Sequence, residues 1–225
     1  MKQLLLDISP SALPILANFV PGRNTELLQT LGNMLTGRER ERFVYLWGAQ
    51  GCGRTHLLQG IAGMCVRNKM AAAYFACAEK IHLDDKEEAD YVLVDDVDRL
   101  GAEAQIGLFN LYNRIRDAGQ AVLLVTGSAA PAQLKLRDDL VTRLGWGLVY
   151  QVHELTDEEK IKAMKSHAAS RGLDLSQEVC DYLLRHKRRD LPTLIATVDA
   201  VDTYSLANRR KVTVPLVREL LQAES

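Results

Sequence analysis

The segment GAQGCGRT at positions 48–55 constrains the fold of this chain more than any other stretch. It follows the compact apolar run 43–47, which predicts a buried strand, and precedes a helical pattern that begins at His56. A glycine-rich turn between a strand and a helix is the arrangement of the phosphate-binding loop GxxxxGK[ST]. Every fixed position of that motif is matched except the lysine, which is replaced by Arg54.

Strand and helix patterns alternate around this loop. Further compact apolar runs predict four more buried strands, at 71–77, 91–96, 121–128 and 148–152. Helical spacing of apolar residues appears over 25–35, where Asn24 is expected to be the cap, and over 102–119, which ends at a glycine. Continuous apolar strands separated by helices predict an α/β fold with a parallel sheet covered on both faces.

The pattern changes after residue 152, where only helical signals follow. Thr156 and Glu159 have the spacing of a capping box that opens a helix. Ser176 is expected to cap a second helix, residues 190–208 predict a third, and Pro215 lies where the first turn of a fourth would be. Residues 153–225 therefore predict a small all-α domain.

The N-terminal residues 1–22 predict an extended arm, because three prolines discourage a continuous helix there: Pro10, Pro14 and Pro21. The expected organisation is thus an arm over 1–22, an α/β domain over 23–152 and the helical domain over 153–225.

Composition excludes several classes of protein. The 28 basic and 29 acidic residues give a net charge of −1, which excludes a protein that coats nucleic acid by charge alone. None of the four cysteines has CxxC spacing, so reduced, buried thiols in a cytoplasmic protein are expected. The sequence has no apolar run of membrane-spanning length, and Asp7 interrupts the short apolar run near the N-terminus, so neither a membrane partner nor a signal peptide is predicted.

The residues of the loop explain how it would bind a nucleotide. Gly48, Gly51 and Gly53 would let backbone N–H groups converge on phosphate oxygens, and the following helix N-terminus favours an anion. Arg54 keeps the positive charge, and Thr55 would ligate Mg²⁺. The competing interpretation is a glycine-rich turn that binds nothing.

Polar residues at the ends of two other predicted strands support the nucleotide interpretation. Asp95 fits the carboxylate that holds Mg²⁺ in phosphate-loop NTPases, and Asp96 the position that orients the attacking water. Because aspartate is one methylene shorter than the glutamate used in many such enzymes, weak intrinsic hydrolysis is expected. Thr126 could touch the terminal phosphate, although threonine is also a common strand end.

Charged residues elsewhere are less specific. Arg143 is expected to follow a helix, and it and Arg189, each taken alone, fit solvated surface arginines. The acidic residues between 84 and 88 fit a solvated loop better than a metal site, and no metal role is assigned to the five histidines.

The order of these features is that of AAA+ ATPases: phosphate loop, acidic strand end, polar strand end, arginine, then a helical lid with another arginine. Four segments make the resemblance narrower: FVPGRN (19–24), GLFNLYNRIRDAG (107–119), LLVTGS (123–128), and DLVTRLGWGLVY (139–150) followed by LTDEEK. Together with GRTH at 53–56, they resemble the DnaA family of bacterial replication initiators and, more closely, its short Hda-type relatives. DnaA itself continues into a helix-turn-helix domain, whereas this chain ends soon after the predicted lid, so the shorter architecture is expected.

This resemblance implies roles for residues of the α/β domain and the lid. Arg143 resembles an arginine finger that acts in trans on the ATP of a neighbouring DnaA. Asp96 and Thr126 resemble the other catalytic elements, and Arg189 resembles the sensor of the lid. ADP or ATP with Mg²⁺ is the implied cofactor, with Thr55 and Asp95 as metal ligands. The implied nucleotide-binding residues are Gly48, Gly51, Cys52, Gly53, Arg54, Thr55, His56 and Arg189, with Phe19, Val20 and Asn24 framing the base.

The resemblance also implies partners. Hda-type proteins begin with a peptide near QLxLPL that binds the DNA polymerase III sliding clamp, and here residues 3–8 read QLLLDI. Gln3, Leu4, Leu6 and Ile8 fit the motif, whereas Asp7 replaces its proline. A short extended peptide with alternating apolar anchors can dock in a groove; the alternative is that these leucines pack on their own domain. DNA would be reached through the clamp, and a homo-oligomer is a further expectation.

The expected function is regulatory: the clamp-tethered protein would stimulate hydrolysis of the ATP bound to DnaA and so inactivate the initiator. The alternatives are a non-catalytic nucleotide-binding adaptor, a stand-alone weak ATPase and a single-strand DNA binder. The segment 78–90 is shorter than the family pattern, which puts any contact made there in doubt.

Overall fold

The computed structural model describes residues 16, 19–77 and 89–223. The clamp-like peptide 3–8 and the acidic residues of segment 84–88 lie outside these described residues. The chain divides into two compact units, Met1–Val152 and His153–Ser225.

The first unit is built on a five-stranded sheet in which every strand pairing is parallel. The strand order is β2-β3-β4-β1-β5, so β1 lies between two strands, β4 and β5, that come much later in the chain. Parallel neighbours cannot be joined by a tight hairpin turn and need crossover connections. The strands are β1 (Phe43–Trp47), β2 (Ala72–Ala76), β3 (Tyr91–Asp95), β4 (Val122–Gly127) and β5 (Leu148–Gln151).

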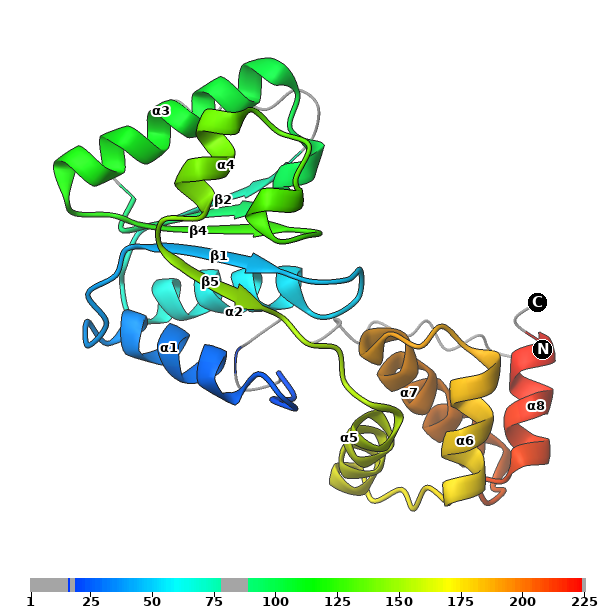
Figure 1. Ribbon diagram of the computed structural model, residues 1–225. Helices are drawn as coiled ribbons and strands as arrows, with labels where there is room; N and C mark the ends of the chain where they lie inside the picture. Colours follow the sequence, from blue (N-terminus) through cyan, green and yellow to red (C-terminus); the bar gives the residue numbers. More distant parts are fainter. Residues whose placement is uncertain (1–15, 17–18, 78–88, 224–225) are drawn as a thin grey trace, which may run out of the picture. The chain divides into compact units, whose positions relative to one another are not determined.

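Helices cover both faces of this sheet (Figure 1). The helices α1 (Thr25–Leu35) and α2 (Arg54–Arg67) pack on one face, while α3 (Ala102–Ala118) and α4 (Asp138–Leu144) pack on the other. Two short 3₁₀ helices, η2 (Val97–Arg99) and η3 (Pro131–Gln133), follow β3 and β4. The predicted α/β class with a parallel sheet is confirmed.

Burial follows position in the sheet. All five residues of β3 are buried, because helices cover this inner strand on both sides. The prediction of five buried strands is wrong for the two edges: β2 and β5 are only partly buried, and Val149 of β5 is 39% exposed. An apolar run alone does not distinguish an edge strand from an inner one.

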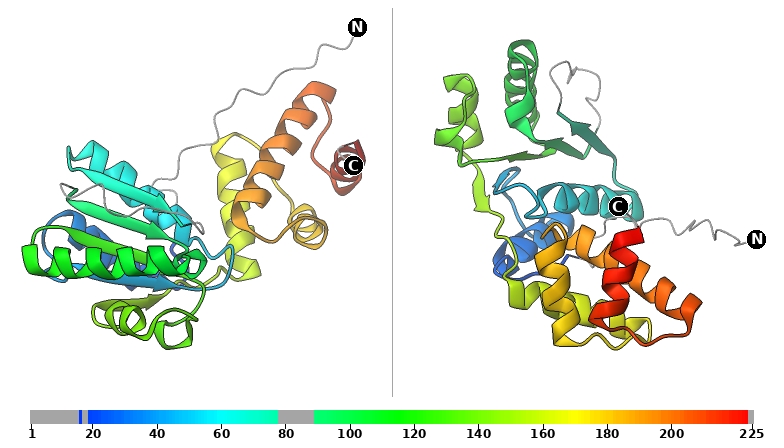
Figure 2. Two further views of the ribbon diagram at one scale, coloured as in Figure 1. Left: turned by 90° about the horizontal axis from the view of Figure 1, so that it is seen from above. Right: turned by 90° about the vertical axis from the view of Figure 1, so that its right-hand side faces the viewer.

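Residues 153–223, the described part of the second unit, form four helices: α5 (Asp157–Ser170), α6 (Gln177–His186), α7 (Leu191–Asn208) and α8 (Val214–Ala223). Their apolar sides share one core, and α6 packs beside α8 (Figure 2). Thr156 and Glu159 form the predicted capping box of α5, and Ser176 caps α6 by accepting from the Val179 N–H. Asp190 caps α7 in the same way through the Thr193 N–H.

Two local predictions need correction. Asn24 occupies the N-cap position of α1, but its side chain does not accept a bond from the helix, because its backbone (φ −97°, ψ 20°) is outside the extended conformation of a capping residue. Arg143 does not follow a helix but lies in the last turn of α4. Over the described residues, we find no helix whose length and apolar character would let it cross a bilayer.

Candidate functional site

Three strands bring the predicted phosphate-site residues to one edge of the sheet. Because β1, β3 and β4 are parallel, their carboxyl ends lie at the same edge, which brings together Gly48 after β1, Asp96 after β3 and Thr126 near the end of β4. The backbone N–H of Gly48 donates to the Gly127 carbonyl at 3.3 Å, which extends the β1–β4 pairing to the start of the loop. The carboxyl edge of a parallel sheet is where ligands bind in open α/β folds.

The glycines of the loop are required by its geometry. Gly53 is the N-cap of α2 with φ of 105°, and Gly51 has φ of 87°, conformations that L side chains rarely adopt. A Cβ on Gly53 would also lie 2.7 Å from the ring of Phe19, and a Cβ on Gly48 would lie 2.5 Å from the Val152 carbonyl oxygen. The loop is therefore held close to its surroundings, with the start of α2 behind it.

Arg54 joins the loop to the acidic strand end. Its guanidinium Nη2 lies 3.2 Å from Asp96 Oδ1, and only 10% of the arginine side chain is exposed. Its second terminal nitrogen, Nη1, is buried without a hydrogen-bond partner. A buried donor without an acceptor costs about 1–3 kcal/mol, and a phosphate oxygen in the loop would supply that acceptor. This unpaired donor fits an anionic phosphate group in the loop.

Thr126 connects the two aspartates. Its hydroxyl donates to Asp95 Oδ1 at 2.6 Å and accepts from the backbone N–H of Asp96 at 2.8 Å, and the residue is fully buried. The other oxygen of Asp95 accepts from the Tyr74 hydroxyl at 2.7 Å. Burial raises the pKa of Tyr74, and its bond to Asp95 adds to this, so the phenol remains a donor. Asp95 is thus oriented from both sides.

Asp96 occupies a strained and charged position. Its φ of 58° and ψ of 57° place a non-glycine residue in the left-handed region. Burial raises the pKa of its carboxyl above the usual value, the Arg54 charge opposes this, and the negative charge of Asp95 adds to the rise. Such strain is found where a side chain is held for a function.

The remaining predicted nucleotide residues have different degrees of exposure. Thr55, in the first turn of α2, is exposed, whereas Cys52 and Asn24 are buried. Val20 and His56 are partly buried, and the rings of Phe19 and His56 are 5.8 Å apart between centroids. The structure therefore brings Phe19 to the loop, next to Gly53 and His56.

Arg143 is held by aromatic rings. Its guanidinium carbon lies 3.9 Å from the ring centroid of Trp146, 5.5 Å from that of Phe109 and 5.9 Å from that of Tyr112. Its Nε is buried and has no hydrogen-bond partner. Within the described part of the chain, no carboxylate pairs with Arg143. The positive charge is positioned but not neutralised.

Arg189 lies in the second unit between α6 and α7. Its Nη2 lies 3.1 Å from Asp157 Oδ2 at the start of α5, and both side chains are about half exposed. An exposed pair of this kind contributes little to stability and leaves the arginine free to exchange partners.

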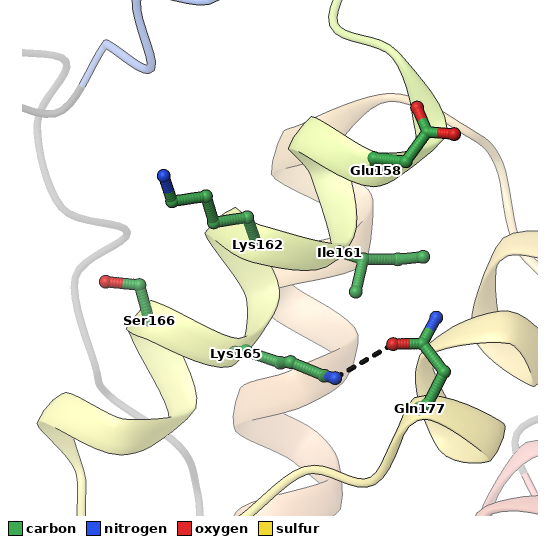
Figure 3. A pocket seen from close by; sticks show the side chains of 6 residues that line it. All are labelled: Glu158, Ile161, Lys162, Lys165, Ser166 and Gln177. Carbon is green, nitrogen blue, oxygen red and sulfur yellow. Dashed lines mark hydrogen bonds between the residues drawn. The ribbon is translucent and has the colours of Figure 1, made fainter.

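One shallow pocket of about 550 Å³ opens on the second unit (Figure 3). It lies along α5 and the start of α6, where Lys165 Nζ donates to Gln177 Oε1 at 2.8 Å. Its lining residues are Glu158, Ile161, Lys162, Lys165, Ser166 and Gln177, so it contains no predicted site residue. Among residues 16, 19–77 and 89–223, no three His, Cys, Asp or Glu side chains are grouped as a metal site would require.

Sequence reasoning missed three contacts made around the predicted site residues and the neighbouring strand ends. Tyr74 reaches Asp95 from the neighbouring strand, Trp146 stacks on Arg143, and Asp98 accepts from both the backbone N–H and the hydroxyl of Ser128 at 2.8 Å. The close sequence spacing of Arg143 and Trp146 offered a signal for one of them. The other contacts join separate strands or loops, and only the strand order shows them.

Two families match the two units of the chain. The bacterial DnaA ATPase domain family matches residues 15–151, and the Hda lid domain family matches residues 157–221. The first match covers more than half of the 225 residues.

Solved structures share the fold. Domain III of the replication initiation protein DnaA from Thermotoga maritima has a TM-score of 0.75 at 21% identity, over 93% of this chain and 95% of that one. DnaA from Aquifex aeolicus bound to AMPPCP has a TM-score of 0.70 at 23% identity, over 84% of this chain and 64% of that one. The Holliday junction branch migration motor RuvB of Thermotoga maritima has a TM-score of 0.67 at 16% identity, over 88% of this chain and 67% of that one. Together with the two family matches, this fold shows that the chain belongs to the bacterial DnaA ATPase domain family and is a DnaA-related AAA+ protein with an Hda-type lid.

Proposed function

We propose that this protein regulates the initiation of DNA replication by stimulating hydrolysis of the ATP bound to DnaA. In this proposal it acts while tethered to the sliding clamp on DNA. The family supports a role beside DnaA, because the chain combines a DnaA-type ATPase domain with an Hda-type lid.

The chain's own site is proposed to hold ADP or ATP with Mg²⁺. The loop glycines and Arg54 would bind the phosphates, and Thr55 and Asp95 would hold the metal, which neutralises phosphate charge when bound. The buried, unpaired Nη1 of Arg54 supports the phosphate assignment. Arg189 would reach the nucleotide as the lid sensor, while Phe19, Val20 and Asn24 would frame the base.

Hydrolysis in this own site is proposed to be weak. A general base must be free to approach the attacking water, whereas Asp96 is paired with Arg54 at 3.2 Å. The hydroxyl of Thr126, the residue expected to touch the terminal phosphate, is engaged with Asp95 and Asp96. These contacts support nucleotide retention over turnover, and so favour a regulator over a stand-alone ATPase.

The observation that carries the proposal is the state of Arg143. It is stacked on Trp146, and no carboxylate of the described residues neutralises it. A preorganised arginine without a partner in its own chain suits a phosphate supplied by another molecule. We therefore assign Arg143 as the arginine finger that stabilises transition-state charge at the ATP of DnaA.

The tether is proposed on sequence alone, because residues 3–8 lie outside the described part of the chain. Gln3, Leu4, Leu6 and Ile8 would dock in a groove of the clamp, which brings the protein to DNA without direct DNA contact. Tethering raises the effective concentration of the protein near DnaA.

A single-turnover assay tests the proposal. DnaA is loaded with labelled ATP, clamp-loaded DNA is added, and ADP formation is followed with and without this protein. Arg143→Ala should lose about 10³-fold of the stimulation or more, the range of an arginine finger. Arg137→Ala is the matched control, because Arg137 flanks the same helix but is already paired with Asp139 at 2.7 Å.

Four outcomes separate the alternatives. Clamp-dependent stimulation that disappears in Arg143→Ala and in Gln3→Ala/Leu6→Ala supports the proposal. Intact nucleotide binding without stimulation indicates the adaptor, and turnover by the protein alone at a comparable rate indicates the ATPase. Full stimulation by Arg143→Ala would overturn the finger assignment.

A further inference from the structure

Trp146 is the closest ring to the Arg143 guanidinium, at 3.9 Å from carbon to ring centroid. At this distance the guanidinium lies over the indole within the range of a cation–π contact. The more distant rings of Phe109 and Tyr112 border the same cation from α3. The indole thus forms a platform that limits the directions in which the arginine fork can point.

The position of Trp146 is itself fixed. It lies between α4 and β5 with a glycine on either side. A Cβ on Gly147 would run into the backbone carbonyl of Phe43, with the carbonyl carbon at 2.7 Å, so β1 and this turn approach too closely for any side chain. Trp146 is nevertheless 55% exposed, whereas most large apolar residues of the described chain are buried. Packing of its own domain core does not account for this residue.

We propose that Trp146 is the positioning residue of Arg143: its ring holds the guanidinium fork ready for the phosphate of a nucleotide on a second AAA+ protein. This inference rests on the proposed role of Arg143 and adds the residue that sets its geometry. An arginine stacked in advance loses less conformational freedom when it meets the phosphate. The ring therefore contributes mainly to the rate at saturation and less to docking.

The test measures the rate of hydrolysis of DnaA-bound ATP at increasing concentrations of this protein. It gives two values: the maximal stimulated rate and the protein concentration at half of that rate. Trp146→Ala should lower the maximal single-turnover rate about tenfold, while the half-maximal concentration changes less than threefold. Trp146→Phe keeps an aromatic platform and should recover most of the rate. Leu206→Ala is the control for loss of an exposed apolar side chain, because Leu206 is 71% exposed and belongs to the other unit.

A spectroscopic readout tests the contact itself. The chain has two tryptophans, Trp47 and Trp146. In a Trp47→Phe background, all tryptophan emission therefore comes from Trp146. Its emission should change when Arg143 is replaced by Ala or Met, and again when ATP-loaded DnaA binds. Unchanged emission in both experiments would show that the stacked contact is not formed in solution and would overturn the inference.

The two proposals fail in different ways. If Arg143→Ala retains stimulation, the finger role fails, and the positioning role falls with it. If Arg143→Ala loses stimulation but Trp146→Ala matches the unmodified protein, only the positioning role is refuted. A loss in Trp146→Ala that appears entirely as weaker docking would make Trp146 an interface residue and would also refute the inference.

Discussion

Thr126→Val should destabilise the α/β unit far more than the small change in side-chain volume suggests. Valine has nearly the same shape as threonine, but it removes the hydroxyl that donates to Asp95 Oδ1 at 2.6 Å and accepts the Asp96 N–H at 2.8 Å. A hydrogen bond to a charged group contributes about 1.5–3 kcal/mol, and an orphaned buried N–H costs about 1–3 kcal/mol. Because Thr126 is fully buried, water cannot replace either bond, and we expect a loss of about 3–5 kcal/mol.

The assay is urea unfolding followed by tryptophan fluorescence. Both tryptophans, Trp47 and Trp146, belong to the first unit, so the signal reports on the unit that contains Thr126. Thr126→Ser is the matched control: it keeps the hydroxyl and loses one buried methyl group, at a cost of about 1 kcal/mol. If Thr126→Val lowers the free energy of unfolding no more than Thr126→Ser does, the hydroxyl does not link the two aspartates and the reasoning is refuted.

Three further perturbations follow from the same contacts. The free energy of unfolding of Asp96→Asn should rise relative to that of the unmodified protein as pH rises from 4 to 7. The folded-state pKa of Asp96 is raised, so ionisation of its carboxyl lowers the stability of the unmodified protein as pH rises through that pKa, whereas Asn does not titrate. Urea midpoints at the two pH values measure this, and the reasoning is contradicted if the midpoint of Asp96→Asn minus that of the unmodified protein falls as pH rises. Gly53→Ala should cost about 2 kcal/mol, because its φ is 105° and the ring of Phe19 lies against it; adding Phe19→Ala should restore only part of the loss, and complete restoration would exclude backbone strain. Thr156→Ala should cost about 1 kcal/mol by removing the capping box of α5, measured as the thermal midpoint of the far-UV signal with Thr156→Ser as the retained-cap control.

Most of the architecture could be predicted because inner strands and helix caps are local signals. The run 91–95 contains only apolar residues before its final aspartate, as a strand covered on both faces requires. The predicted caps Thr156 and Ser176 occupy the positions at which their side chains accept helix N–H groups. The edge strands were less predictable, since their apolar residues resemble those of inner strands while their neighbours in space differ.

The contacts within the candidate site depend on strand order, which the sequence does not state. Thr126 reaches Asp95 because β4 lies beside β3 with Val94 paired to Val125. Tyr74 reaches the same carboxylate from the opposite side, because β2 is the other neighbour of β3. A motif search identifies Asp95 itself, but the two hydroxyl donors that orient it come from segments about 20 and 30 residues away.

The two arginines of the proposed mechanism share a property that no motif displays. Each has a buried nitrogen without a hydrogen-bond partner, Nη1 in Arg54 and Nε in Arg143, and among the buried side-chain atoms of the described residues only Asn113 Oδ1 shares this state. Folded proteins satisfy nearly all such groups, since each unpaired one costs about 1–3 kcal/mol. For Arg54 the acceptor would be a phosphate in the chain's own loop. Arg143 Nε is buried within its own chain, so a phosphate of a second molecule would meet the terminal nitrogens of that guanidinium instead. The unpaired Nη1 therefore supports a nucleotide held by this protein, whereas the assignment of Arg143 depends on its position over Trp146 and on its charge, which no described carboxylate neutralises.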